Sequence, residues 1–301
     1  MKTVRNIAIA LVILFVFVVA YGLFEPRLLD VTQEQAVIPN LPENWEGQEI
    51  AVLGDFQIGL WGDNADTVEE AVEEIIERDP AAVLMLGDFI YHPKNETQKK
   101  ITENIEALKP IGEADIPVYS VMGNHDFGLK KKDSQPLNEA ATKLRQALKE
   151  IGVEVLHNES ALLGVDGDAL PDVSKGLYIA GVGSNWMGDD SASEALEGIA
   201  TDAPRIVMMH NPNSFVKFPA NSAPFSVAGH THGGQIRLPG LPGWSWMDFT
   251  SEEEKHTDGW IENYGAAGNQ LYVNRGIGMS TVPIRINAKP ELTIFTLVSK
   301  Q

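Results

Sequence analysis

The sequence contains no cysteine among its 301 residues. Disulfides and thiolate metal sites are therefore excluded, and the absence is compatible with an oxidising compartment without identifying one. Basic residues are also scarce, because 23 Lys and Arg stand against 42 Asp and Glu and give a formal net charge of -19. A protein that binds a nucleic-acid backbone needs a basic surface, so we expect no nucleic-acid partner.

The chain also lacks internal repeats and low-complexity tracts. Its composition, with 44% hydrophobic and 22% charged residues, is ordinary for a globular protein and favours a folded domain over general disorder. The length allows one large α/β domain or two small ones.

The N-terminal segment has no charge between Asn6 and Phe24, and its central part consists of Ile, Val, Leu, Phe and Ala. At about 1.5 Å per residue, a helix of this length spans the hydrocarbon core of a bilayer. Lys2 and Arg5 precede the apolar run, whereas only Arg27 follows it closely. The positive-inside rule then predicts a single-pass protein of the cell membrane whose main domain is extracytoplasmic.

A cleavable signal peptide is the alternative, because Ala20-Tyr21-Gly22 loosely resembles a cleavage site. The apolar run exceeds the usual length of a signal-peptide core, which favours a retained anchor. We therefore expect residues 1–24 to be a membrane anchor or uncleaved signal, and the acidic, proline-containing residues 25–47 to be a linker. Residues 48–298 are expected to form the globular domain.

Short apolar runs alternate with helical patterns from Gln48 onward, which indicates an α/β domain. Asp66, with Glu69 three residues later, is expected to cap the first helix of this domain. The expected helices cover residues 66–78, 96–108 and 136–151. The expected strands cover residues 49–53, 81–86, 117–122, 153–156, 177–180, 205–209, 225–228, 271–274 and 292–297.

Five of these strands end in a short polar cluster, and the clusters contain Asp55 and Gln57, Asp88, Asn124 and His125, His210, and His230 and His232. Each cluster alone is most often an ordinary turn. Ligands of α/β sheets gather at the carboxyl ends of strands, so five such clusters in order can converge on one site. Oxygen and nitrogen donors without sulfur suit Mn²⁺, Fe or Zn²⁺, and the Asp88 carboxylate can bridge two cations.

The motif series Asp55-x-Gln57, Gly87-Asp88, Gly123-Asn-His-Asp126, His210 and Gly229-His-Thr-His232 resembles the signature of the calcineurin-like metallophosphoesterases. Two longer stretches, 229–239 and 273–278, resemble its bacterial membrane-associated branch. That branch includes phosphodiesterases and UDP-2,3-diacylglucosamine pyrophosphatases. The resemblance covers residues 48–298, which it identifies as the catalytic domain.

The resemblance implies a four-layer α/β/β/α sandwich, preceded here by one transmembrane helix, with two divalent metal ions at the sheet edge. Mn²⁺ is favoured over Fe or Zn²⁺. The first metal would be held by Asp55, Gln57, Asp88 and His232, and the second by Asp88, Asn124, His210 and His230. A hydroxide between the two metals would attack phosphorus. His125 would protonate or stabilise the leaving oxygen.

Two positions depart from the family pattern. The usual first motif is Asp-x-His, whereas this chain has Gln57, whose carbonyl oxygen either ligates the first metal or only bonds a metal-bound water. Many members have an aspartate three residues after the Asp88 position, where this chain has Tyr91. Tyr91 is expected to orient or pack against neighbouring groups, with metal ligation as the alternative.

We expect hydrolysis of a phosphodiester or pyrophosphate bond, and the membrane anchor favours a lipid-linked substrate. The alternatives are a nucleotide or glycerophosphodiester substrate, or a catalytically retired metal-binding scaffold. Arg237 and Arg275 could grip an anionic substrate or form structural salt bridges. Trp244, Trp246 and Trp260 could enter the membrane interface or line an acyl site, but packing within a long loop is favoured.

Overall fold

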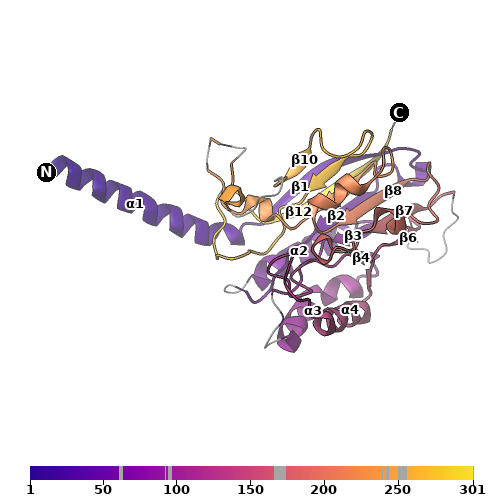
Figure 1. Ribbon diagram of the computed structural model, residues 1–301, viewed down its shortest axis with the longest axis horizontal. Coiled ribbons are helices and arrows are strands. Elements are labelled where there is room, and N and C mark those ends of the chain that lie inside the picture. The colour runs from indigo at the N-terminus through magenta and orange to yellow at the C-terminus, as the bar shows by residue number, and fades with distance from the viewer. Residues whose placement is uncertain are drawn as a thin grey trace.

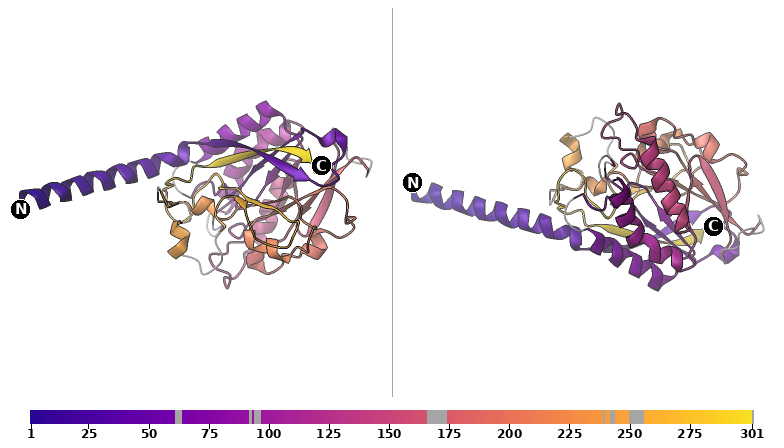
Figure 2. Two further views of the ribbon diagram at one scale, coloured as in Figure 1. Left: turned by 90° about the horizontal axis from the view of Figure 1, so that it is seen from above. Right: turned by 90° about the horizontal axis from the view of Figure 1, so that it is seen from below.

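The computed structural model describes residues 1–60, 64–91, 93, 97–165, 174–238, 240–241, 244–249 and 256–300. Two six-stranded sheets are stacked against each other, and one long helix projects from the domain (Figures 1 and 2). The projecting helix is α1 (Lys2–Phe24), whose apolar side chains are almost all exposed. By length and composition, α1 is the one candidate membrane span among the described residues.

The first sheet has the strand order β1-β12-β2-β3-β4-β5. The strands β2 to β5 are parallel, β12 is antiparallel to β2, and β1 is parallel to β12. Its strands are β1 (Asp30–Ile38), β2 (Glu49–Leu53), β3 (Ala82–Met85), β4 (Val118–Ser120), β5 (Val153–Val155) and β12 (Glu291–Ser299). Three helices cover its outer face, α2 (Ala65–Arg78), α3 (Thr97–Glu113) and α4 (Asn138–Glu150).

The second sheet has the order β10-β11-β9-β8-β7-β6, with antiparallel strands at its two edges. Short helical segments pack on its outer face, chiefly α5 (Ala192–Ala195) and η4 (Pro212–Lys217). The strands are β6 (Glu159–Leu163), β7 (Leu177–Gly181), β8 (Arg205–Met209), β9 (Ser226–Ala228), β10 (Gly259–Ile261) and β11 (Leu271–Val273).

Side chains alternate between two cores, as the period of two in a strand requires. In β2, Ile50 and Val52 join the core between the sheets, whereas Ala51 and Leu53 pack against the helices. A third core lies between the second sheet and its short helices. The expected four-layer α/β/β/α fold is therefore confirmed, with a thin fourth layer in the described part of the chain.

The segment expected to be a linker differs in the structure. Asp30–Ile38 is strand β1, which pairs with β12 over nine residues. Ala36 and Ile38 are fully buried, and so is Trp45, whose indole N–H donates to the Lys175 carbonyl at 2.9 Å. The acidic residues Asp30 and Glu34, which lie within the stretch expected to be a linker, are half-buried in this edge strand.

Helix ends also differ from expectation. Asn64 rather than Asp66 precedes α2, and its amide donates to the Phe56 carbonyl at 2.7 Å instead of capping the helix. Helix α3 continues through Pro110 to Glu113, where Ile111 is fully buried. The strands β6 and β10 were not predicted, because both are largely half-exposed and neither contains a continuous buried apolar run.

Candidate metal centre

The carboxyl ends of strands from both sheets meet at one edge of the sandwich. The structure brings the seven predicted metal ligands together there in one continuous chain of contacts. The residues are Asp55, Gln57, Asp88, Asn124, His210, His230 and His232, and all are buried except His230, which is half-buried. The first four follow strands of the first sheet, and the three histidines follow β8 and β9 of the second.

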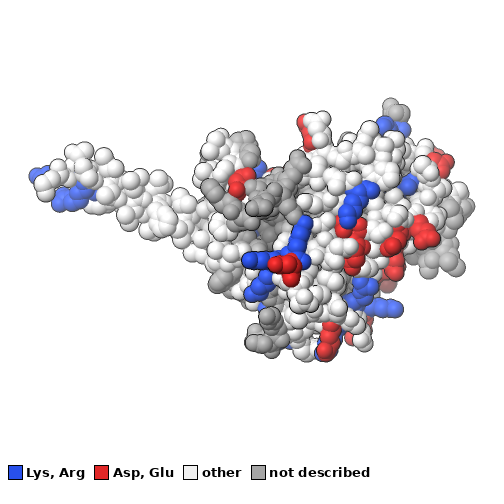
Figure 3. All heavy atoms as spheres, in the orientation of Figure 1, with Lys and Arg blue, Asp and Glu red and all other residues white. Residues whose placement is uncertain are grey.

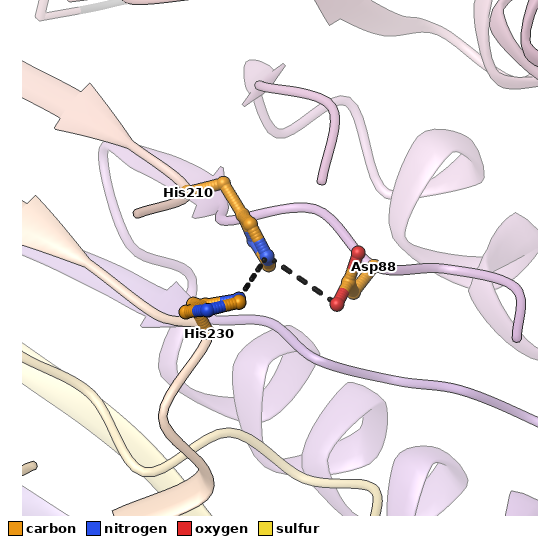
Figure 4. A group of neighbouring side chains, drawn as sticks. All are labelled: Asp88, His210 and His230. Atoms are coloured by element: carbon orange, nitrogen blue, oxygen red, sulfur yellow. Dashed lines mark hydrogen bonds and ion pairs between the residues drawn. The ribbon is translucent and has the colours of Figure 1, made fainter. Parts of the chain in front are cut away.

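His210 is the centre of one half of this cluster. Its Nε2 lies 3.1 Å from Asn124 Oδ1 and 3.2 Å from His230 Nδ1. Its Nδ1 lies 2.7 Å from the Leu86 carbonyl oxygen, which fixes the ring. Figure 4 shows that His210 and His230 converge on Asp88 from neighbouring strands of the second sheet. Asp88, His210 and His230 each offer a ligand atom within 4.8 Å of the others, a spacing that suits a metal ion.

The other half consists of Asp55, Gln57 and His232. Gln57 Nε2 lies 3.2 Å from His232 Nε2, which in turn lies 3.9 Å from Asp55 Oδ1. The Asp55 carboxylate also accepts the His230 main-chain N–H, at 3.1 and 2.9 Å to its two oxygens. This bond ties the first sheet to the second at the site.

Asp88 joins the two halves. Its Oδ2 lies 3.3 Å from His210 Nε2 in one half and 3.3 Å from Gln57 Nε2 in the other. Its Oδ1 accepts the main-chain N–H of His125 at 2.8 Å. Gly123 is needed for this arrangement, because a Cβ at that position would overlap Asp88 Oδ1. The geometry thus places one carboxylate between two sets of three donors.

The backbone is strained where most of these side chains leave it. Asp55, Gln57, Asp88, His230 and His232 all have positive φ, between 44° and 72°. Non-glycine residues rarely adopt this conformation, and strain of this kind collects at functional sites. Surrounding hydrogen bonds hold the strained conformation, such as that from Gln57 N to Asp88 O at 3.0 Å.

Two supporting residues were given no role from the sequence, although Asp126 closes one of the motifs. Asp126 is fully buried and accepts the main-chain N–H groups of Asp88, Gly123 and Ile90 at 2.9, 2.8 and 3.2 Å. Arg285 is also fully buried and donates to a group of carbonyl oxygens that includes Gly278. Gly278 O in turn lies 3.3 Å from His232 Nδ1, so Arg285 supports the loop behind that ligand.

Burial and mutual charge shift the ionisation of this cluster. Burial, followed by the charge of Asp88, raises the pKa of Asp126 to about 7, and burial chiefly raises that of Asp55 to about 7. Burial disfavours the charge on Asp88, but the nearby His210 outweighs it and the pKa of Asp88 is lowered. Burial likewise disfavours imidazolium at His210, but the Asp88 carboxylate outweighs it and raises the pKa of His210 to about 9.

The two remaining histidines stay neutral near pH 7. Burial, with the positive charge of Arg285, lowers the pKa of His232 to about 3. Burial and the charge of His210 lower the pKa of His230 well below its usual value. A neutral imidazole offers a lone pair, so both rings are in the form that binds a metal.

Gln57 gives an independent indication that the residues fit a metal ion. Its side-chain oxygen is buried and has no hydrogen-bond partner. A buried polar atom without a partner is unfavourable unless another group satisfies it. Rotation of the amide by half a turn would put this oxygen where Nε2 now lies, close to Asp88 Oδ2 and His232 Nε2. There it could coordinate a cation that these two atoms also bind.

His125 meets the cluster through its main-chain N–H, and its ring packs against Tyr91 with centroids 4.5 Å apart. The structure therefore favours the packing interpretation of Tyr91. Arg237 and Arg275 both form salt bridges, the first with Asp258 at 2.6 Å and the second with Asp30 at 2.7 Å. These contacts favour the structural role for both arginines.

Trp260 packs in an aromatic group, as expected, but it lies on strand β10 and not in a loop. Its ring centroid lies 5.4 Å from that of Tyr272 and 5.9 Å from that of Phe225, and its indole N–H donates to Glu34 at 3.0 Å. Trp186 was not considered from the sequence. Its ring lies edge-on to His230, with centroids 5.4 Å apart, and forms part of the wall of the site.

Carboxylate, amide and imidazole donors at the edge of an α/β/β/α sandwich are the features of a metal-dependent phosphoesterase. The chain belongs to the calcineurin-like phosphoesterase family, whose profile matches residues 49–234. The resemblance deduced from the motifs is thereby confirmed, and the protein is an enzyme of a family that uses divalent metals.

Three relatives illustrate the match. The metallophosphoesterase YkuE of Bacillus subtilis is 26% identical over 276 residues, which cover 91% of this chain and 87% of that protein. The phosphodiesterase YaeI of Escherichia coli is 28% identical over 233 residues, covering 77% and 75%. The UDP-2,3-diacylglucosamine pyrophosphatase LpxG of Chlamydia trachomatis is 23% identical over 317 residues, covering 90% and 89%. Among solved structures, a dimetal phosphatase from Danio rerio aligns with a TM-score of 0.41 and 12% identity, over 79% of this chain and 90% of that one.

Proposed function

We propose that the protein hydrolyses a phosphodiester or pyrophosphate bond with two divalent metal ions, at a site anchored to the cell membrane. The observation that carries this proposal is the position of Asp88. A single carboxylate oxygen, Oδ2, contacts Gln57 Nε2 on one side and His210 Nε2 on the other, at 3.3 Å each. A carboxylate placed between two donor sets is what a dinuclear site needs, because one bridging ligand holds both cations at once.

The contacts divide the donors into two sets that share Asp88. One set is Asp55, Gln57, Asp88 and His232, and the other is Asp88, Asn124, His210 and His230. Bound metal ions would lower the pKa of a water molecule and stabilise charge on the phosphoryl oxygens. Mn²⁺ suits a site in which hard oxygen donors, including the Gln57 carbonyl, share the ligation with imidazoles, and Fe or Zn²⁺ are the alternatives.

We assign His125 the role of stabilising or protonating the leaving oxygen. Burial lowers the pKa of its imidazole. Its main-chain bond to Asp88 fixes the residue beside the cluster, and the Tyr91 ring restricts its imidazole from one side. A ring held in this way can donate a hydrogen bond to the departing oxygen and stabilise it, and its imidazolium form can deliver a proton to that oxygen.

A lipid-linked substrate is the class that we favour. The support is the apolar helix α1, together with the similarity to LpxG, whose name specifies a diacylated sugar nucleotide. A nucleotide or glycerophosphodiester substrate is the second candidate. A retired scaffold is disfavoured, because Asp88 and His125 are both present and in place.

The test is Asp88→Asn. Purified wild-type protein should hydrolyse bis-p-nitrophenyl phosphate with Mn²⁺ and lose this activity with EDTA. Asp88→Asn should reduce both the bound metal and the activity, because the amide removes the shared negative charge. The matched control is Asp190→Asn, since the buried Asp190 carboxylate bonds to Asn185, Ser214 and Lys217 instead. Full activity of Asp88→Asn would overturn the dinuclear proposal.

The orientation is tested separately. The charge asymmetry around α1 favours a domain outside the cytoplasmic membrane. Protease added to intact spheroplasts should therefore digest the domain, and protection until lysis would reverse the orientation.

A further inference from the structure

The end of α1 is built into the folded domain. The Gly22 carbonyl accepts the Arg285 N–H at 3.0 Å, and a Cβ at Gly22 would overlap the Ile284 side chain. The fully buried Glu25 carboxylate accepts the main-chain N–H groups of Asn287 and Ala288 at 2.9 and 2.6 Å. The helix is therefore a fixed extension of the domain and not a flexible tether.

The apolar surface of α1 continues up to this junction. Tyr21, Leu23 and Phe24 are each about half exposed, with 47%, 49% and 53% of their surface accessible. Figure 3 shows that, on the face drawn, the charged side chains of α1 lie at its N-terminal end and none lies between them and the domain. If α1 spans a bilayer, the membrane surface lies at its last turn, directly against the domain.

The metal-site edge of the sandwich is at the end of the domain that holds the last turn of α1. Strand β1 begins a few residues after α1, with Asp30 opposite Glu291 of β12. Strand β12 is antiparallel to β2, and Val52 near the carboxyl end of β2 lies opposite Thr293. The carboxyl end of β2, which leads to Asp55 and Gln57, therefore adjoins the start of β1 and the end of α1.

One loop connects the junction of α1 with the metal site directly. Gly278 and Arg285 belong to the segment that receives Gly22 and Glu25, and Gly278 O lies 3.3 Å from His232 Nδ1. The Arg285 side chain donates to Gly278 O at 3.0 Å, and the main-chain N–H of the same residue donates to Gly22 of α1. Arg285 therefore contacts both the end of α1 and the loop behind the predicted ligand His232.

Exposed apolar side chains lie at this end of the domain. Arg237 N donates to the Ile286 carbonyl at 2.9 Å, and Ile286 packs beside Gly22. The following residues Leu238 and Leu241 are 45% and 55% exposed. All the ribbon views place the orange segment η6 (Trp246–Phe249), which follows shortly after Leu241, level with the last turn of α1 along the long axis (Figures 1 and 2).

We propose that the domain rests directly on the bilayer, with Leu238, Leu241 and the last turn of α1 in the headgroup region and the metal-site edge facing the same lipids. The inference depends on the proposed retention of α1 as a membrane span. Zwitterionic phospholipids suit this contact, because the formal net charge of -19 repels an anionic surface. The exposed Arg27 adds a positive charge at the junction, where it can bond a phosphate. A substrate held in the outer leaflet would then reach the site without leaving the membrane.

The absence of native cysteine permits a direct test. Full-length Leu241→Cys protein is labelled with an environment-sensitive fluorophore and reconstituted in phosphatidylcholine vesicles that contain headgroup-labelled quencher lipid. The control is Glu43→Cys, an exposed site between the end of β1 and the start of β2. Because β1 is nine residues long, this site lies roughly 30 Å further from the junction.

We expect quenching at Leu241→Cys and none at Glu43→Cys. Equal quenching of the two labels, or none at either, would overturn the inference. Hydrolysis of soluble bis-p-nitrophenyl phosphate with Mn²⁺ is measured in the same vesicles. Activity without quenching overturns only the membrane contact, whereas quenching without activity overturns the proposed function and supports the contact.

Discussion

Backbone conformation fixes where the ligand side chains of this site lie. Gln57 has a φ of 44°, and its main-chain N–H donates to the Asp88 carbonyl at 3.0 Å. These constraints act on the main chain, so they hold whatever the side chain at position 57 is. An imidazole at this position would therefore point to the same place as the amide, which makes the one departure from the usual ligand pattern open to experiment.

Gln57→His should preserve the binding of two metal ions, whereas Gln57→Ala should weaken the first metal selectively. The alanine variant retains Asp55, Asp88 and His232 but loses one donor. We expect a loss of at least about 10-fold in affinity, since even an outer partner of a metal ligand contributes that much. The second metal shares only Asp88 and should bind nearly as before. Metal titrations of the three proteins decide this, and identical affinities for wild type and Gln57→Ala would show that Gln57 does not ligate.

His125→Ala should separate chemistry from metal binding. The bond from residue 125 to Asp88 uses the main-chain N–H, so it survives the substitution and metal content should stay unchanged. Turnover should fall by roughly 10²–10⁴, the usual contribution of a general acid. The loss should shrink for substrates with very good leaving groups, which need little protonation. Metal analysis and steady-state kinetics check this, and loss of metal would make His125 a ligand instead.

Tyr91→Phe is the matched control for this variant. It keeps the ring against His125 and removes only the hydroxyl, so metal content should again be unchanged and turnover should fall far less than in His125→Ala.

The ligands could be predicted from the sequence because each follows an apolar strand in a short motif. Their supporting residues could not. Arg285 stands between two isoleucines, and nothing in the sequence indicates that its guanidinium donates to five backbone carbonyls. Glu25 follows the apolar helix as an ordinary acidic residue, and only the folded chain brings it to Asn287 and Ala288. Such roles depend on contacts between distant segments.

At the scale of elements, strands with continuous apolar runs were predictable and strands with mixed faces were not. β2 and β8 are buried on both faces, so their composition identifies them. β1 contains Asp, Gln and Glu on half-buried or exposed positions, and its role as an edge strand appears only in its pairing with β12. Because β1 is part of the first sheet, a stable domain must begin before β1 and not after it.

A chain that begins at Glu25 should fold, whereas a chain that begins at Gln48 should not. The shorter chain loses β1 and the buried side chains of Ile38, Leu41 and Trp45. Each large apolar side chain contributes about 1.5–3 kcal/mol when buried, so the loss is about 5 kcal/mol or more, comparable with the whole stability of many domains. Thermal denaturation of the two soluble proteins tests this. Equal melting temperatures would restore the linker interpretation of residues 25–47.

At the scale of the whole molecule, the site exists only when both sheets are in place. Asp55, Asp88 and Asn124 follow strands of the first sheet, and His210 and His230 follow strands of the second. The unfolded chain does not hold these donors together. Metal binding is therefore linked to global stability, and each bound ion should stabilise the folded state by an amount that grows with its concentration.

The metal-free protein should lose stability as the pH rises from about 7 to about 9. The folded state raises the pKa of His210 from 6.5 to about 9, so this contribution is complete below pH 6.5 and is lost as the pH passes through about 9. Asp55 and Asp126, whose pKa values are raised from 3.8 to about 7, retain protons that the unfolded chain has released. They therefore lower stability between about pH 4 and pH 7. The depressed pKa of His232 acts in the opposite direction, but only between about pH 3 and pH 6.5.

Metal should reverse this trend, because it binds the deprotonated forms of the same groups. Each proton released on binding makes the affinity up to about 10-fold higher per pH unit, or about 1.4 kcal/mol. The difference in melting temperature between samples in Mn²⁺ and in EDTA should therefore widen by a few degrees per unit from pH 7 to about 8.5. Asp88→Asn is the control, since it should show little Mn²⁺-dependent stabilisation at any pH. A difference that narrows as the pH rises would mean that His210 gives up no proton to the metal, and would remove it from the ligand set.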